Sequence, residues 1–107
     1  MSNLTKDDAE EIARKLRRGR PTIGRQRFEV VEQSRGGYRW ISISYGGRRL
    51  ARYGIKHGSR RNAGHDWIPG QIHLSDSEAY DFAKCHLSID GYIDILARKN
   101  IVAARPT

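Results

Sequence analysis

The feature that most constrains the fold is a β-hairpin in the middle of the chain. From Tyr38 to Tyr45 apolar and polar residues alternate, as along a strand that buries one face. Gly46-Gly47 is typical of a two-residue hairpin turn, and a second alternating stretch runs from Arg48 to about Lys56. The apolar face is predicted to carry Ile41, Ile43, Tyr45, Ala51, Tyr53 and Ile55. The other face is predicted to carry Trp40, Ser42, Ser44, Arg48, Leu50 and Arg52.

Other segments must cover the apolar face of this hairpin. A first strand is predicted at residues 26–33, followed by a turn at residues 34–37. Apolar residues at helical spacing predict helices at residues 6–16, 76–84 and 89–99. Their expected N-caps are Thr5, Ser75 and Ser88, and the first two begin capping boxes with Asp8 and Glu78.

This order of segments predicts an α+β fold. We expect an N-terminal helix, a three-stranded antiparallel sheet and two C-terminal helices packed on one face of it. A loop rich in glycine and polar residues is expected at 58–70. The 107 residues suffice for a single domain, 1–107, with an ordered core at 5–99 and a loose tail at 100–107.

Basic residues are concentrated in the part of the chain that forms the predicted sheet. The chain has 20 Lys and Arg against 12 Asp and Glu, a formal charge of +8. Between residues 33 and 65 there is no acidic residue, and eight basic ones repel one another in the fold: Arg35, Arg39, Arg48, Arg49, Arg52, Lys56, Arg60 and Arg61. Most of the basic residues are arginine, whose planar guanidinium binds phosphate through two hydrogen bonds.

We therefore predict a nucleic-acid-binding protein that contacts the phosphate backbone, without a choice between DNA and RNA. The predicted contact residues are the arginines and tryptophans of the sheet and of its neighbouring segments: Arg17, Arg18, Arg20, Arg25, Arg27, Arg39, Trp40, Arg48, Arg49, Arg52, Lys56, Arg60, Arg61 and Trp67.

The rest of the sequence bears on the cellular location of the protein and on whether it binds a cofactor. No apolar run is long enough to span a bilayer, and the N-terminal residues do not resemble a secretory signal. The single cysteine, Cys85, is expected to be buried or inert and fits a reducing compartment, so we expect a cytoplasmic protein. Phosphate-binding and dinucleotide-binding glycine motifs are missing, and we predict no cofactor.

The loop after the third predicted strand contains the residues that could perform chemistry. His65 could transfer protons at neutral pH while neighbouring arginines stabilise charge on a phosphate, and Trp67 could stack on a base. These roles suffice for metal-independent cleavage of RNA. In the alternative interpretation, His65 and Asp66 only form hydrogen bonds across the loop. His57, His65 and His73 do not have the spacing of a compact metal site, so no metal is predicted.

Two resemblances support these interpretations. The segment Arg17-Arg18-Gly19-Arg20-Pro21 resembles an AT-hook, which implies an extended backbone lying in the minor groove of A·T-rich DNA. The order helix, three strands and helix, over about residues 5–83, is similar to that of the HicA toxins, small basic ribonucleases. That family places its histidine after a Gly-Ser pair on the first strand, whereas here Gly58-Ser59 follows the third strand and His65 comes later.

Three functions thus remain open from the sequence. The first is a non-catalytic nucleic-acid-binding module, and the second is a HicA-like ribonuclease that uses His65. The third is a small inhibitor or adaptor, of the kind that phages encode, whose basic face docks on an acidic protein surface.

Overall fold

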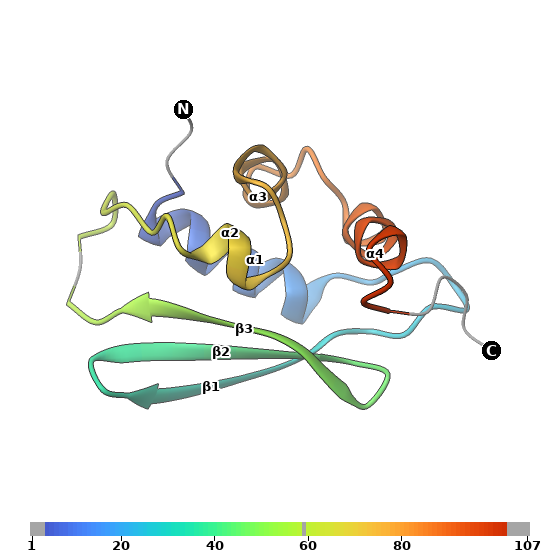
Figure 1. Cartoon of the computed structure of the whole chain (residues 1–107), viewed down its shortest axis with the longest axis horizontal. Helices are drawn as coiled ribbons and strands as arrows, with labels where there is room; N and C mark the ends of the chain where they lie inside the picture. Colours follow the sequence, from blue (N-terminus) through green and yellow to red (C-terminus); the bar gives the residue numbers. More distant parts are fainter. Residues whose placement is uncertain (1–3, 59, 103–107) are drawn as a thin grey trace.

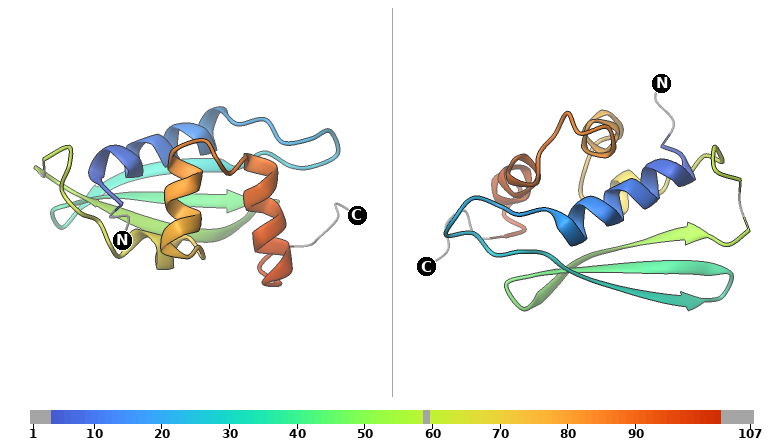
Figure 2. Two further views of the ribbon diagram at one scale, coloured as in Figure 1. Left: turned by 90° about the horizontal axis from the view of Figure 1, so that it is seen from above. Right: turned by 180° about the vertical axis from the view of Figure 1, so that it is seen from behind.

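The computed structural model describes residues 4–58 and 60–102, and these residues form two layers (Figure 1). One layer is a three-stranded antiparallel sheet, and the other contains the helices, all on the same side of that sheet (Figure 2). The predicted α+β fold is therefore confirmed. Its elements, in chain order, are α1 (Lys6–Arg18), β1 (Glu29–Arg35), β2 (Tyr38–Tyr45), β3 (Arg48–Lys56), α2 (Ile68–Gln71), α3 (Asp76–Ala83) and α4 (Ile89–Arg98).

The helices begin at the predicted caps. The Thr5 hydroxyl accepts a hydrogen bond from the Asp8 amide, and the Asp8 carboxylate accepts one from the Thr5 amide, which completes a capping box. Ser75 and Glu78 form the same arrangement at α3, and Ser88 caps α4. Helix α1 continues two residues beyond the predicted end, to Arg18. The loop predicted at 58–70 also contains the first three residues of the short helix α2, which starts at Ile68.

The sheet follows the chain order β1-β2-β3, with tight turns at Gly36-Gly37 and Gly46-Gly47. All four turn glycines have positive φ values, between 60° and 82°, a conformation that side chains with a Cβ rarely adopt. Strand β1 begins three residues later than predicted, at Glu29, and ends at Arg35 beside the turn.

An irregularity between β2 and β3 corrects one predicted side-chain direction. Ile43 is paired with Ala51, but the next residue, Ser44, is paired with Arg49, so Leu50 is an extra residue on β3. Leu50 is half-buried and packs against the core, whereas strict alternation placed it on the polar face. Alternation alone cannot locate a bulge.

The core lies between the sheet and the helices. Helix α1 contributes the predicted stripe of Ala9, Ile12, Ala13 and Leu16, and the strands contribute Ile41, Ile43, Ala51, Tyr53 and Ile55. The hydroxyl groups of two buried tyrosines donate hydrogen bonds to main-chain carbonyl oxygens of the helix layer. Tyr53 donates to the carbonyl oxygen of Ala9 at 2.9 Å, and Tyr92 donates to that of Ile72 at 3.0 Å.

Three smaller expectations concern the C-terminal tail, the cysteine and membrane-spanning segments. Ile101 and Val102, expected in a loose tail, pack against the core, and residues 103–107 lie outside the described residues. Cys85 is exposed rather than buried. Among the described residues, no helix is long and apolar enough to cross a membrane.

Candidate nucleic-acid interface

The sheet has one face that none of the described helices covers (Figures 1 and 2). Its residues follow from the strand register. Directly paired residues point to the same side of the sheet, and successive residues along one strand point to opposite sides. Ile41 and Ile43 face the core, so their neighbours on β2 and the partners of those neighbours face outwards. We call this surface the open face, and its residues are Glu29, Val31, Gln33, Arg35, Tyr38, Trp40, Ser42, Ser44, Arg49, Arg52, Gly54 and Lys56.

A stack of flat side chains lies at the centre of the open face. The Arg52 guanidinium lies over the Trp40 ring, 4.7 Å from its centroid, and the Trp40 and Tyr38 rings stack with centroids 5.5 Å apart. Gly54 leaves room for the two rings, because a Cβ there would lie 3.0 Å from Trp40 and 3.1 Å from Tyr38. We call these three side chains the Arg52–Trp40–Tyr38 stack.

Cations lie at both ends of the open face. Arg48 and Arg49 begin β3 at the β2–β3 turn, and Arg35 lies at the opposite end, in the row of paired residues that also contains Tyr38 and Lys56. Arg35, Arg48 and Arg49 are exposed, and none of the three forms an ion pair with a residue in 4–58 or 60–102. Glu29 is the one carboxylate among the residues of the open face. This surface is therefore strongly positive.

The outer edge of β3 is closed by side chains of the segment that follows it. His65 accepts the Lys56 amide through Nε2, and Trp67 donates through Nε1 to the carbonyl oxygen of Gly54 at 2.8 Å. The Gln71 side chain accepts the Gly54 amide, and His73 Nε2 lies 2.9 Å from the carbonyl oxygen of Leu50. These four side chains take the place of a fourth strand at this edge. Hydrogen bonds of His65 across the loop were one of the two predicted alternatives, but no sequence pattern indicated that Trp67, Gln71 and His73 also bond to this edge.

His65 therefore has a structural position. Its side chain is buried, with 1% of the residue exposed, and Nδ1 lies 3.0 Å from the carbonyl oxygen of Ala63. Because a carbonyl only accepts, Nδ1 carries the proton and Nε2 is the acceptor for Lys56. Both ring nitrogens are bonded to the main chain, so the geometry does not support proton transfer between His65 and a substrate.

Arg39 was predicted to contact nucleic acid, but it lies on the face of the sheet that the helices cover. It forms ion pairs with Glu32 at 3.0 Å and with Glu10 of α1 at 2.8 Å, and 23% of its side chain is exposed. The hydrogen bond from Arg39 holds the pKa of Glu32 below its usual value, although partial burial opposes this. Arg39 therefore joins the sheet to α1, and it does not lie with the other predicted contact residues on the open face.

Other predicted contact residues also pair within the helix layer or next to it. Arg17 contacts Glu32, Arg25 contacts Asp90 and Asp94, and Arg61 contacts Asp7. Arg27 donates to the carbonyl oxygen of Arg17. Arg18, Arg20 and Arg60 are exposed but lie outside the open face. Of the predicted residues, the open face unites Trp40, Arg49, Arg52 and Lys56, with Arg48 at its turn and Trp67 at its rim.

Arg35 and Tyr38, which shape the open face, were absent from the predicted contact residues. Arg35 was assigned to a turn, and Tyr38 was treated only as the start of a strand. Alternation back from Trp40 places Tyr38 on the same face, and a two-residue turn at Gly36-Gly37 pairs Tyr38 with Arg35.

Only part of the AT-hook-like segment has the extended backbone that its resemblance implies. Arg17 and Arg18 belong to the last turn of α1, whereas Gly19, which ends the helix by donating to the carbonyl oxygen of Lys15, is extended. A Cβ on Gly19 would overlap the side chain of Ile89, so this glycine lets α1 and α4 approach closely.

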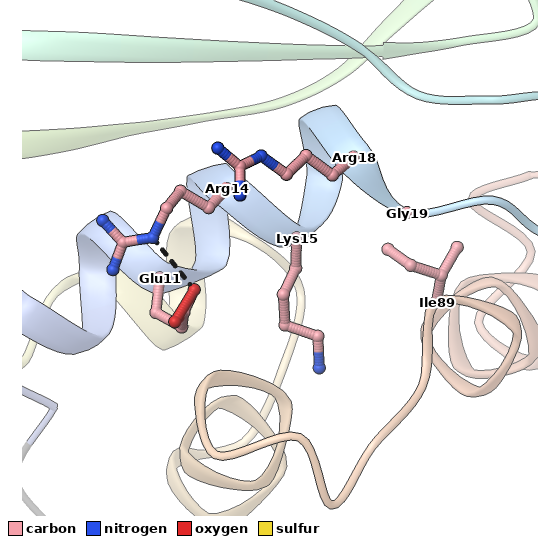
Figure 3. Close-up of a pocket in the computed structure, with 6 residues that line it drawn as sticks. All are labelled: Glu11, Arg14, Lys15, Arg18, Gly19 and Ile89. Carbon is pink, nitrogen blue, oxygen red and sulfur yellow. Dashed lines mark hydrogen bonds and ion pairs between the residues drawn. The ribbon is translucent and has the colours of Figure 1, made fainter.

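A shallow cavity of about 330 Å³ lies beside the same turn of α1 (Figure 3). Two of its three cations are bound within the protein: Arg14 pairs with Glu11, and Lys15 donates to the carbonyl oxygens of Phe82 and Leu87. The third, Arg18, is exposed. Burial lowers the pKa of Lys15. The described residues contain no cluster of three His, Cys, Asp or Glu side chains that could hold a metal ion.

No family model, curated protein sequence or solved structure matches the chain. The resemblances to AT-hooks and to HicA toxins rest on a short motif and on the order of elements, and they stay predictions. The function is therefore argued from the open face itself.

Proposed function

We propose that this protein binds nucleic acid, with the open face and the cations at its two ends as the surface that contacts the phosphate backbone. The observation that supports the proposal best is that Arg35, Arg48, Arg49 and Arg52 lie on or beside one face without a carboxylate partner among the described residues. Phosphates are the usual partners of such a cluster of arginines.

The contrast with the rest of the molecule strengthens this argument. Most acidic side chains near the sheet are used inside the fold: Glu10 and Glu32 hold Arg39, and Asp90 and Asp94 hold Arg25. Arg35, Arg48, Arg49 and Arg52 receive no such compensation from the described residues, so their mutual repulsion is relieved when an anion binds. This repulsion lowers the stability of the unbound protein, as expected for a surface that binds a polyanion.

Salt dependence and a pair of charge variants test the proposal. We expect binding to mixed nucleic acid to weaken linearly with the logarithm of salt concentration, because each phosphate contact releases a counterion. Arg48→Ala with Arg49→Ala should reduce the slope by about 2, or roughly 1 per phosphate contact. The measurement is filter binding or fluorescence anisotropy at several salt concentrations.

The control variant is Arg14→Ala with Arg98→Ala, which removes the same charge from exposed positions of α1 and α4. It should leave the slope nearly unchanged. If both double variants weaken binding equally, the open face is not the contact surface. If affinity for nucleic acid is absent, or does not respond to salt, the proposal fails and an acidic protein becomes the better partner.

The two other predicted functions are not carried into this proposal. A ribonuclease would need a proton-transfer group, and His65 is buried with both nitrogens bonded. The adaptor interpretation uses the same positive face and is distinguished by the salt experiment. A cytoplasmic location, predicted from the sequence, agrees with a nucleic-acid partner.

A further inference from the structure

We infer that the nucleic acid is B-form duplex DNA and that Arg52, held by Trp40, contacts base edges in the major groove. The inference rests on the proposed function and adds the class of nucleic acid and the residue that reads it. Three observations support it. The rings of the Arg52–Trp40–Tyr38 stack are covered by one another, the Arg52 guanidinium has no ion pair with a described residue but is held on the Trp40 ring, and cations lie at both ends of the open face.

The aromatic rings of the open face are not arranged to receive the bases of a single strand. Proteins that bind single strands offer open ring faces on which bases stack. Here Trp40 already stacks on Tyr38 and lies under Arg52, while Tyr38 also meets the edge of Trp67, with centroids 6.2 Å apart. A base could stack on Trp40 only by displacing one of these neighbours.

The same contacts prepare Arg52 for recognition. Its guanidinium forms no ion pair with the described residues, yet its position is restrained by the Trp40 ring 4.7 Å away. A planar guanidinium fixed on a ring presents its N–H donors in one plane and loses little side-chain entropy on binding. Guanine offers two acceptors in the major groove, O6 and N7, and arginine contacts both in the commonest specific contact with DNA.

The cations flank this central arginine at a suitable separation. Arg35 and Arg49 are paired with Tyr38 and Ser44 of β2, which are six residues apart. At roughly 3.3 Å per residue, the backbones of Arg35 and Arg49 lie about 20 Å apart along the strand direction. Since the major groove is about 12 Å wide and has a phosphate strand on each side, long side chains at the two ends can reach both phosphate strands while Arg52 faces the bases.

The shape of the surface favours DNA over duplex RNA. The stack lies on β2 and β3 of the three-stranded sheet, and the major groove of B-form DNA is wide enough to admit two neighbouring strands. The major groove of A-form RNA is deep and narrow, so side chains on a sheet cannot reach its base edges.

The first experiment compares three probes of one sequence and length at the same salt concentration: duplex DNA, single-stranded DNA and duplex RNA. We expect duplex DNA to bind at least tenfold more tightly than either of the others. If single-stranded DNA or duplex RNA binds as tightly as duplex DNA, the inference is overturned while the proposed function stands. If none of the three binds, both fail.

The second experiment tests the contact with guanine. Duplexes that bind best are selected from a randomised pool, and each guanine is then replaced by 7-deazaguanine, which keeps base pairing but removes N7. We expect replacement of the contacted guanine to weaken binding roughly 2- to 12-fold, the range for losing one hydrogen bond of the pair while O6 still accepts the other. A selected duplex that binds equally well after every replacement contradicts the inference.

Two matched variants assign the contact to Arg52. Arg52→Met keeps an apolar stem beside Trp40 but has no donor, so it should bind the normal and the 7-deazaguanine duplexes with similar affinity. Arg49→Met, at the end of the same strand, removes the same charge and should retain the wild-type discrimination. Circular dichroism confirms that both variants are folded. If Arg52→Met discriminates as well as the wild type, the assignment to Arg52 is wrong.

Discussion

Among single residues, burial separates two histidines that look alike in the sequence. His57 and His65 both lie in the basic stretch after β3, and His57 is exposed. His65 is buried and connects the Lys56 amide to the carbonyl oxygen of Ala63. A buried polar side chain that links two main-chain groups contributes to stability, because its removal leaves those groups without a hydrogen-bond partner. The position of the side chain therefore decides between a structural and a catalytic role.

We predict that His65→Ala lowers the free energy of unfolding by about 2–3 kcal/mol, because it removes the acceptor of the Lys56 amide and leaves a cavity. Urea denaturation measures the change. His57→Ala, an exposed control in the same segment, should stay within about 0.5 kcal/mol of the wild type. Wild-type stability of His65→Ala, together with loss of an RNA-cleaving activity, would restore the catalytic interpretation.

Among the secondary-structure elements, the side chains of β2 fit closely against β3 because residue 54 is a glycine. A glycine inside a strand usually weakens it, but here the missing side chain gives space to Trp40 and Tyr38 from the neighbouring strand. Its main chain is also bonded on the outer edge, to Gln71 and Trp67. The glycine thus joins the aromatic stack, the sheet and the segment before α3.

We predict that Gly54→Ala displaces the two rings, lowers the free energy of unfolding by about 1–2 kcal/mol and changes the near-ultraviolet circular dichroism of the tryptophans. The matched control is Gly70→Ala in α2, where a Cβ would meet no atom within 4 Å and alanine favours a helix. The control should be neutral or slightly stabilising. An unchanged aromatic spectrum for Gly54→Ala would show that the rings do not depend on the glycine.

The elements themselves were largely predictable from the sequence. Thr5, Ser75 and Ser88 begin their helices as predicted because capping is a local interaction. The alternation around Ile41 and Ile43 correctly placed the core face of β2 for the same reason. The direction of Leu50 was wrong, because a bulge depends on how two strands are joined rather than on the composition of either one.

In the whole molecule, several carboxylates are engaged by the hydrogen bonds and ion pairs that hold the layers and helix caps together. The pKa of Glu32 is lowered by its hydrogen bond from Arg39, and that of Asp90 by the Thr22 amide and hydroxyl. Hydrogen bonds from Ser75 lower the pKa of Glu78. Burial tends to raise the pKa of Asp8, but hydrogen bonds from Thr5 and Lys84 lower it overall.

These shifts predict a loss of stability in acid. A carboxylate with a lowered pKa binds fewer protons in the folded state than in the unfolded state, so its stabilising contribution is complete above the ordinary carboxyl pKa of about 4. The contribution disappears as pH falls through the lower folded values. We expect the Tm to fall progressively between about pH 5 and pH 2. Glu32→Gln should lose less stability over this range, and a flat profile for the wild type would contradict the prediction.

Local features of this protein are readable in its sequence: the helix caps, the glycine turns, the apolar face of the hairpin and the excess of arginine. Each depends on residues that are close together in the chain. Which arginines lack a carboxylate partner, in contrast, follows from the packing of the helices on the sheet. Arg39 and Arg52 look equivalent in the sequence, but Arg39 lies under α1 between two carboxylates and Arg52 lies on the open face. Ion pairing is set by distances between elements, which the order of residues does not contain.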